Sequence, residues 1–333
     1  MTEVRTDTVS VAERARHYQA DGAVVAAHFL GGTASFVLGE EALLLARGEE
    51  CRRIAVHAGA ILAVACDGKR VVTGGDDGAV KATDAAGAST DVAADTKKRW
   101  IDHVAIGPDR ALAWSAGKEA FVQLASGTKV YEAPSTVGAL AFAPKGLRLA
   151  IAHYHGVSLW FPNAKAEPER VEWKGSHLAA RFSPDGRFLI SAMQEPSLHG
   201  WRLADRKDMR MQGYAARVRS LGWTSDGRWL ASSGANQLVL WPFQGKDGPM
   251  GKPASTLASA QTLVEAVACH PKEPIVATGY ADGLVLLVRI EDGAEILARK
   301  PAGAPITALA WNEAGTALAF GTEDGDAGVV DLA

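Results

Sequence analysis

Three stretches of the chain share one layout, and this repetition constrains the fold more than any other feature of the sequence. They read "LAFAPKGLRLAIAHYHGVSLW", "ARFSPDGRFLISAMQEPSLHGW" and "LGWTSDGRWLASSGANQLVLW". Each contains an apolar run, a turn, a second apolar run, a second turn and a third run that ends on tryptophan. Gly146, Gly186 and Gly227 in the first turns are 40 and 41 residues apart.

Five weaker copies follow the same layout, so we count eight repeats. They read "AVVAAHFLGGTASFVLGEEALLLA", "AILAVACDGKRVVTGGDDGAVKAT", "HVAIGPDRALAWSAGKEAFVQL", "AVACHPKEPIVATGYADGLVLLV" and "ALAWNEAGTALAFGTEDGDAGVVDL".

Each repeat is predicted to form an antiparallel meander. Asp-Gly pairs adopt the positive φ angles of tight hairpins, while Val, Leu, Phe and Trp suit half-buried strands. Short segments between the repeats, such as "RRIAVH", "TKVYEA", "RVEWKG", "DMRMQG" and "EILARK", can supply a fourth strand. A four-stranded sheet about every 40 residues is typical of the blades of a β-propeller, in which neighbouring sheets bury each other's faces.

The repeats resemble those of the WD-repeat β-propeller family over nearly the whole chain, most clearly in "FSPDGRFLISA" and "WTSDGRWLASSGANQLVLW". The resemblance implies an all-β propeller of four-stranded antiparallel blades that acts as a protein-interaction scaffold. It also implies a polar tetrad of His, Ser or Thr, Asp and Trp within a blade. The second repeat matches three of these roles at His57, Thr73 and Asp77, but Thr83 stands in place of the Trp.

Other repeats depart further from the family pattern. The seventh keeps only Thr278 and Asp282 of the tetrad, and none of Trp160, Trp201 and Trp241 is followed by Asp. We therefore expect most blades to depend on apolar packing.

Ring closure is predicted to involve the N-terminus. The last repeat stops at Leu332 after its third strand, and an unpaired sheet edge invites aggregation. We expect residues around Thr8 to Ala12 to supply the missing strand and close the ring. The sequence thus predicts one propeller domain over residues 1–333, with a closing strand and lead-in over about residues 1–20 and eight repeats over 21–333. Seven blades are the alternative.

Composition narrows the class of protein. The 35 Lys and Arg residues against 38 Asp and Glu give a net charge of -3, which argues against a nucleic-acid partner. The N-terminus lacks the apolar region of a signal peptide, and no apolar run in the chain is long enough to span a membrane. Three cysteines without CxxC spacing predict free thiols. We expect a cytoplasmic protein that binds no membrane and is a monomer on its own.

A search for catalytic and metal-binding patterns finds none that is complete. His153 and His155 have the spacing of metal ligands on a strand, but no third ligand is identifiable, so turn histidines are the expected reading. We expect no cofactor, no metal and no enzymatic activity. The alternative is a hydrolase or lactonase whose metal or substrate lies in the central channel near Asp102, His103 and Glu265.

These patterns predict binding of a protein or peptide partner on the channel face, where loops project from a rigid scaffold. The loop "KKRWIDHV" places an aromatic residue among cations, as in many interface hot spots. Packing of Trp100 between blades is the other possibility for that residue. Charges at the inner-strand position shared by Asp102, Arg219 and Glu265 are expected near the channel mouth. The predicted partner-binding residues are Arg99, Trp100, Asp102, His103, Tyr154, His155, Arg217, Arg219 and Glu265.

Overall fold

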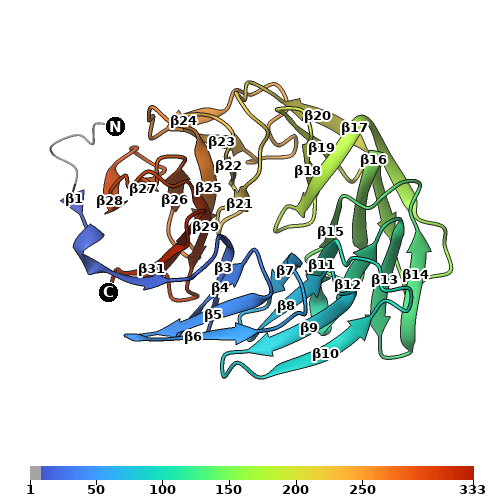
Figure 1. Ribbon diagram of the computed structural model, residues 1–333. Coiled ribbons are helices and arrows are strands. Elements are labelled where there is room, and N and C mark those ends of the chain that lie inside the picture. The colour runs from blue at the N-terminus through green and yellow to red at the C-terminus, as the bar shows by residue number, and fades with distance from the viewer. Residues whose placement is uncertain (1–8) are drawn as a thin grey trace. The chain divides into compact units, whose positions relative to one another are not determined.

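The computed structural model describes residues 9–333, which form two compact units. One unit comprises the chain up to Ala55 together with Val218–Ala333, and the other comprises Val56–Arg217. Both are built from antiparallel sheets that follow one another along the chain as the blades of a β-propeller (Figure 1). The predicted all-β fold is therefore confirmed. A single domain over residues 1–333 stays a prediction.

The unit that contains both ends of the described chain has four sheets. In each sheet the repeat begins with the inner strand. The first consists of β3 (Val24–Leu30), β4 (Thr33–Leu38), β5 (Ala42–Arg47) and β6 (Glu50–Ala55). The second consists of β21 (Leu221–Trp223), β22 (Trp229–Ser232), β23 (Leu238–Pro242) and β24 (Ser255–Leu257). The third consists of β25 (Val264–Cys269), β26 (Ile275–Tyr280), β27 (Val285–Arg289), β28 (Glu295–Arg299) and, at its edge, β1 (Val9–Ser10). The fourth consists of β29 (Ile306–Trp311), β30 (Ala317–Thr322), β31 (Asp326–Asp331) and β2 (Ala15–Gln19).

The unit of residues 56–217 has three sheets. The first consists of β7 (Ile61–Cys66), β8 (Arg70–Gly75), β9 (Ala79–Asp84) and β10 (Ser89–Ala94). The second consists of β11 (His103–Ile106), β12 (Leu112–Ala116), β13 (Glu119–Leu124) and β14 (Gly127–Glu132). The third contains β15 (Ala139–Phe142), β16 (Leu149–Trp160), β17 (Glu169–Phe182), β18 (Phe188–Met193), β19 (Leu198–Arg202) and β20 (Lys207–Met211). Two short 3-10 helices, η1 (Ala12–Arg14) and η2 (Pro108–Arg110), complete the elements.

The six-stranded sheet holds two repeats, because β16 folds back on itself and β17 passes from one repeat to the next. Nε2 of His153 and Oγ of Ser158 are 3.0 Å apart, whereas five steps along a straight strand span roughly 16 Å. The first half of β16 pairs with β15 and the second half with the start of β17, whose remainder pairs with β18. The eight predicted repeats therefore occupy seven hydrogen-bonded sheets.

The first turn of most repeats has the predicted chemistry. Gly186 and Gly227 have φ angles of 75° and 66°, in the left-handed region that glycine tolerates without strain. In the Gly186 turn, Oγ of Ser183 donates to Asp185 at 2.6 Å and accepts from the amide of Phe188 at 2.9 Å. These bonds lie within the hairpin itself and involve no neighbouring sheet.

Apolar side chains between neighbouring sheets make the cores. Phe36, Leu38 and Val24 of the first repeat pack with Ala319 and Val329 of the last, all buried. Such packing of one sheet face on the next explains why no single four-stranded sheet needs to bury both faces alone.

The N-terminal strand pairs with the last repeat as predicted, but the predicted residues were wrong. The outer strand of the last sheet is β2, whose residues Ala15 to Gln19 pair with β31. Val9 and Ser10 instead pair in parallel with β28 of the preceding sheet. Ala12 starts η1, and Thr8 lies outside the described residues. The strand lies later because two sheets, not one, take up the N-terminal segment.

Candidate functional site

In residues 56–217, connections between repeats are hydrogen-bonded to the turns within repeats. The amide of Ala133 donates to the carbonyl of Lys118 at 2.9 Å, and the amide of Gln194 donates to the carbonyl of Ser176 at 3.0 Å. These bonds join the connections and turns into one framework. We call this framework the loop face, and it consists of residues 95–102, 117–118, 133–138, 153–155, 173–176, 194–197 and 212–217.

Arg99 holds its own loop together. Nη2 donates to Asp95 at 2.6 Å and to Glu119 at 2.5 Å, and Nε donates to the second oxygen of Asp95 at 3.2 Å. These hydrogen bonds raise the pKa of Arg99 and lower that of Asp95. The guanidinium therefore binds carboxylates of the protein itself, and Arg99 supports the conformation of the loop that carries the predicted surface.

Trp100 is 62% exposed, so the alternative in which it packs between blades is wrong. The neighbouring Ile101 takes the buried place instead. It is 0% exposed, and its side chain lies so close to Gly74 that a Cβ at that glycine would be 2.5 Å from Cγ2. The loop thus exposes Trp100 and buries the next residue, Ile101.

Asp102 and His103 make local hydrogen bonds. The carboxylate of Asp102 accepts from the amide of Gly117 at 3.1 Å. Nε2 of His103 lies 3.1 Å from the carbonyl of Val137, and burial lowers the pKa of this imidazole. These hydrogen bonds join both side chains to the neighbouring backbone.

The shared inner-strand position coincides with a β-bulge in several repeats. The register with the second strand shifts around Leu178, Glu265 and Thr307, and likewise around Val25 and Leu62. A bulged residue is left unpaired in the ladder. Val25, Leu62 and Leu178 are 47%, 40% and 38% exposed. The shared position was aligned only from the third repeat onward. Val25 and Leu62 of the first two repeats were therefore not predicted.

Tyr154 and His155 lie together at the bend of β16. Their ring centroids are 3.8 Å apart, and Tyr154 is 52% exposed. The amide of Tyr154 donates to Oγ of Ser135 at 2.9 Å, which ties the bend to the preceding connection. His155 has a φ of 69°, so the chain reverses within these residues.

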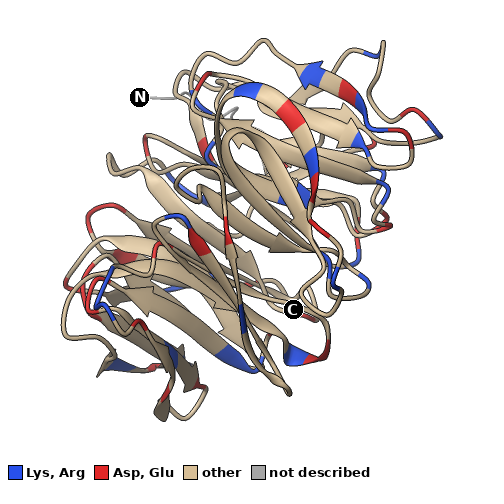
Figure 2. Ribbon diagram, turned by 90° about the vertical axis from the view of Figure 1, so that its right-hand side faces the viewer, with Lys and Arg blue, Asp and Glu red and all other residues tan. Residues whose placement is uncertain are grey.

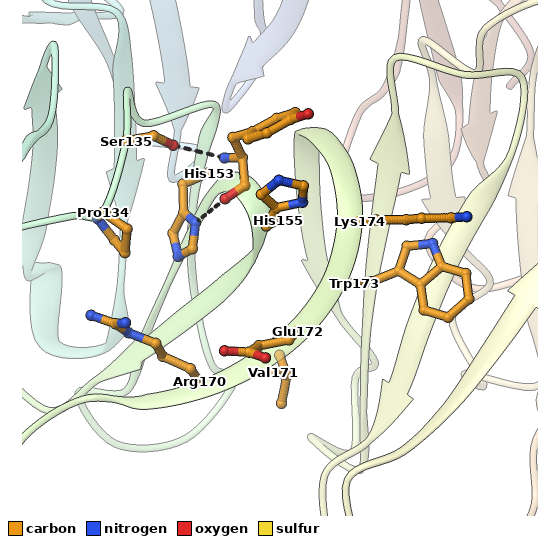
Figure 3. A pocket seen from close by; sticks show the side chains of 10 residues that line it. Pro134, Ser135, His153, His155, Arg170, Val171, Glu172, Trp173 and Lys174 are labelled. Carbon is orange, nitrogen blue, oxygen red and sulfur yellow. Dashed lines mark hydrogen bonds between the residues drawn. The ribbon is translucent and has the colours of Figure 1, made fainter.

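A pocket of about 490 Å³ opens beside this bend. Arg170 and Glu172 extend from β17 toward the side of Pro134, whereas Trp173 and Lys174 extend to the opposite side (Figure 3). These residues of β17 were not predicted, because "RVEWKG" was expected only to supply a fourth strand. The lining residues are Pro134, Ser135, His153, Tyr154, His155, Arg170, Val171, Glu172, Trp173 and Lys174.

The other predicted residues do not all join this surface. Nη1 of Arg217 donates to Oε1 of Gln194 at 3.2 Å, which places Arg217 on the loop face. Arg219 and Glu265 belong to the other unit, where the amide of Arg219 donates to Oγ of Ser233. The predicted set is therefore divided between the two units.

Three tetrad roles of the second repeat are occupied as the resemblance implied. Nε2 of His57 is 2.8 Å from Oγ1 of Thr73, and Nδ1 is 3.0 Å from Asp77. Burial alone would raise the pKa of Asp77, but the amides of Ala58 and Ala79 and the His57 ring lower it. This network joins the start of the inner strand to the turn after β8.

A second polar pair lies in the fifth repeat and was not predicted. Nδ1 of His177 is 2.7 Å from Oγ of Ser191, and Nε2 is 3.0 Å from the carbonyl of Trp173. His177 follows the bend of β17. The available signal was that His177 directly precedes Leu178, the aligned inner-strand position.

The described residues contain neither a metal-binding cluster nor a membrane-spanning helix. Within residues 9–333, no group of three or more His, Cys, Asp or Glu side chains is arranged to hold a metal ion. No helix among the described residues has the length and apolarity to cross a membrane. Basic and acidic residues alternate along the strands and loops on the side shown in Figure 2.

Comparison with known proteins identifies the repeats. The family model "WD domain, G-beta repeat" matches residues 48–84, which carry the His57 network, and residues 207–241 in the sixth repeat. Two segments of the chain therefore match the WD repeat. The eight repeats of the chain differ in how far they keep the family's polar residues, and the second keeps the most.

Two curated WD-repeat relatives come from Arabidopsis thaliana. The chain is 30% identical to the small ribosomal subunit protein RACK1z over 31% of its own length and 39% of that protein. It is 22% identical to THO complex subunit 3 over 50% of its own length and 52% of that protein. The chain thus spans about half or less of the length of these relatives.

A solved structure shares the fold. The crystal structure of the computationally designed Ika8 protein aligns with a TM-score of 0.74 over 94% of this chain and 98% of that chain, at 18% identity. At this identity the likeness concerns the fold alone.

Proposed function

We propose that this protein is a non-catalytic WD-repeat scaffold that binds a peptide or protein partner on the loop face. The single observation that carries the proposal is the exposure of Trp100 and Tyr154 at 62% and 52% on a hydrogen-bonded framework. Large aromatic residues dominate the energetics of protein interfaces, and a rigid frame lowers the entropy lost on binding. The two curated relatives are named as parts of a ribosomal subunit and of a complex, which supports an assembly role.

The pocket beside Tyr154 adds a place for a side chain of the partner. Its volume of about 490 Å³ lies within the range of pockets that bind small groups. A cytoplasmic location and a monomeric state on its own are part of the proposal.

The hydrolase alternative has less support. Asp102 and His103 are hydrogen-bonded to Gly117 and to the carbonyl of Val137, and Glu265 belongs to the other unit. Metal analysis of the purified protein tests the alternative, and a stoichiometric metal ion would favour it.

The experiment replaces Trp100 and Tyr154 together with Ala and compares captured partners by mass spectrometry. A matched control replaces Val130 and Phe161, which are 53% and 38% exposed but lie outside the loop face. We expect the first variant to lose its main partner and the control to keep it. An unchanged set of partners in the first variant would contradict the assignment of this surface.

A further inference from the structure

The loop that presents Trp100 also presents lysines. Lys97 and Lys98 precede Arg99 and Trp100, and the side chain of Lys97 is 67% exposed. Lys118 is exposed in the turn after β12, next to Glu119, which accepts from Arg99. Two exposed lysines therefore precede Trp100 in its own loop, and a third lies in the turn that Arg99 joins to that loop.

The carboxylates near this indole are already engaged. Asp95 and Glu119 share the guanidinium of Arg99, with N to O distances of 2.6 and 2.5 Å, and the side chain of Asp95 is only 3% exposed. Asp102 accepts from the amide of Gly117. The exposed charged groups of this loop and turn are therefore the lysines.

The lysines differ in how they are paired. Nζ of Lys97 reaches Glu119 only at 3.9 Å, near the limit of an ion pair. Among the described residues, no carboxylate lies within ion-pair distance of Lys98 or Lys118. Two ammonium groups therefore remain for an incoming carboxylate.

The backbone of this loop is held in one conformation. Lys98 has a φ of 52°, in the left-handed region that costs a residue with a Cβ roughly 1 kcal/mol. One carboxylate oxygen of Asp95 accepts from the amides of Lys97 and Arg99 at 3.0 and 2.9 Å, and the carbonyl of Asp95 accepts from the amide of Lys98. Strain held in place by such bonds is a feature of binding loops, because it orients their side chains before the partner arrives.

We infer that the segment bound at Trp100 is an acidic linear peptide, whose carboxylates contact Lys98 and Lys118 while an adjacent apolar residue packs on the indole. This inference rests on the proposed function and names the chemistry of its partner. Residues 95–102 and 117–119 together carry four cations against three carboxylates. The positive charge available to the peptide is therefore confined to this part of the surface. Lysine meets a carboxylate as a point charge, which suits a flexible acidic segment.

The test uses the full chain and an array of capped ten-residue peptides with equal apolar content. Four classes are compared by fluorescence anisotropy: Asp/Glu-rich, Asn/Gln-rich, Lys/Arg-rich and phosphoserine peptides. We expect Asp/Glu-rich peptides to bind roughly tenfold more tightly than their Asn/Gln counterparts, since tenfold corresponds to one modest charge contact. The Lys98→Glu, Lys118→Glu double variant should remove that advantage.

A matched control reverses Lys246 and Lys272, two exposed lysines of the other unit, and should retain the preference. Equal binding of acidic and neutral peptides, a preference for phosphoserine over Asp/Glu, or undiminished acidic binding by the Lys98, Lys118 variant would overturn the inference. The scaffold proposal is tested separately by the Trp100, Tyr154 variant. If that variant loses the captured partner, the scaffold proposal stands even when the peptide results overturn the acidic preference. Retention of that partner would instead remove the scaffold proposal.

Discussion

Arg299 and Asp326 form a partly buried ion pair between neighbouring sheets, with 2.8 Å between Nη2 and Oδ2. Arg299 ends β28 and its side chain is 8% exposed, whereas Asp326 begins β31. The other oxygen of Asp326 lies 2.9 Å from Nδ1 of His17 in β2. One carboxylate therefore links the N-terminal closing strand to two C-terminal sheets.

Removal of this carboxylate should destabilise the protein. Asp326→Ala would leave a buried guanidinium without its partner, which costs about 3 kcal/mol in comparable cases. Chemical denaturation measures the free energy of unfolding. As the control, Asp292→Ala removes the partner of Arg289, a pair with 2.6 Å between the atoms but both side chains about half exposed, and should change little. Similar losses in both variants would contradict this account.

Gly75 should tolerate no larger side chain. A Cβ there would lie 2.4 Å from Nδ1 of His57 and 2.6 Å from Asp77. Gly75→Ala should therefore disrupt the polar network and cost about 2 kcal/mol, as overpacking does elsewhere. Gly32→Ala is the control, because nothing lies within 4 Å of its Cβ. A thermal melt that shows equal midpoints for the two variants would refute the prediction.

His199 predicts a dependence of stability on acid pH. Burial, with smaller effects of His177 and Arg210, lowers the pKa of this imidazole from 6.5 to about 3. The folded state thus keeps the ring neutral, while the unfolded chain binds a proton below about pH 6.5. Stability is then full above that pH and falls by up to about 1.4 kcal/mol per pH unit toward pH 3.

His199→Phe should reduce this loss. The ring stacks on Trp173 at 4.0 Å, and its nearest acidic oxygen, on Asp208, is 3.5 Å away, so a phenyl ring keeps the main contact. We expect little change at pH 7.5 and a growing advantage of the variant between pH 6 and 4. Parallel stability profiles for the two proteins would show that another group governs acid unfolding.

Tyr18 should anchor the closing strand. It is 7% exposed, its hydroxyl donates to the carbonyl of Gly48 at 2.6 Å, and its ring lies 6.3 Å from that of Phe36. Tyr18→Phe removes only the hydrogen bond and should cost about 1 kcal/mol, whereas Tyr18→Ala should cost about 3 kcal/mol or more. Hydrogen exchange of the β2 amides provides the local measurement. Unchanged protection in Tyr18→Ala would exclude this role.

The thiols should differ in reactivity. Burial raises the pKa of Cys269 to about 12 and also raises that of Cys66, whereas Cys51 is exposed. Because the thiolate is the nucleophile, iodoacetamide at pH 8 should modify Cys51 first. Peptide mapping by mass spectrometry reads the order, and earlier modification of Cys269 would contradict it.

Much of the fold could be predicted because its signals are local. The Asp-Gly turn at Gly186 and the alternation of apolar residues around it specify a hairpin within some twenty residues, and repetition extends that result along the chain. The exposed placement of Tyr154 followed in the same way from its position in a turn.

The separate roles of Arg99, Trp100 and Asp102 in the loop of residues 95–102 could not be predicted in this way. Sequence alone placed Arg99, Trp100 and Asp102 together as candidate contacts. Only the three-dimensional arrangement shows Arg99 bound to Asp95 and Glu119, and Asp102 bound to Gly117. Spacing along the chain does not reveal which charges neutralise each other.

By itself the sequence determined the repeats, their antiparallel meanders and the need for an N-terminal strand, because turn chemistry and strand periodicity act between near neighbours. Tertiary structure decided that Ala15 to Gln19 supply that strand, that the fourth and fifth repeats share a sheet, and that Trp100 faces solvent while Ile101 is buried. Those outcomes depend on contacts between residues far apart in the chain, where competing pairings differ little in local preference and packing selects among them.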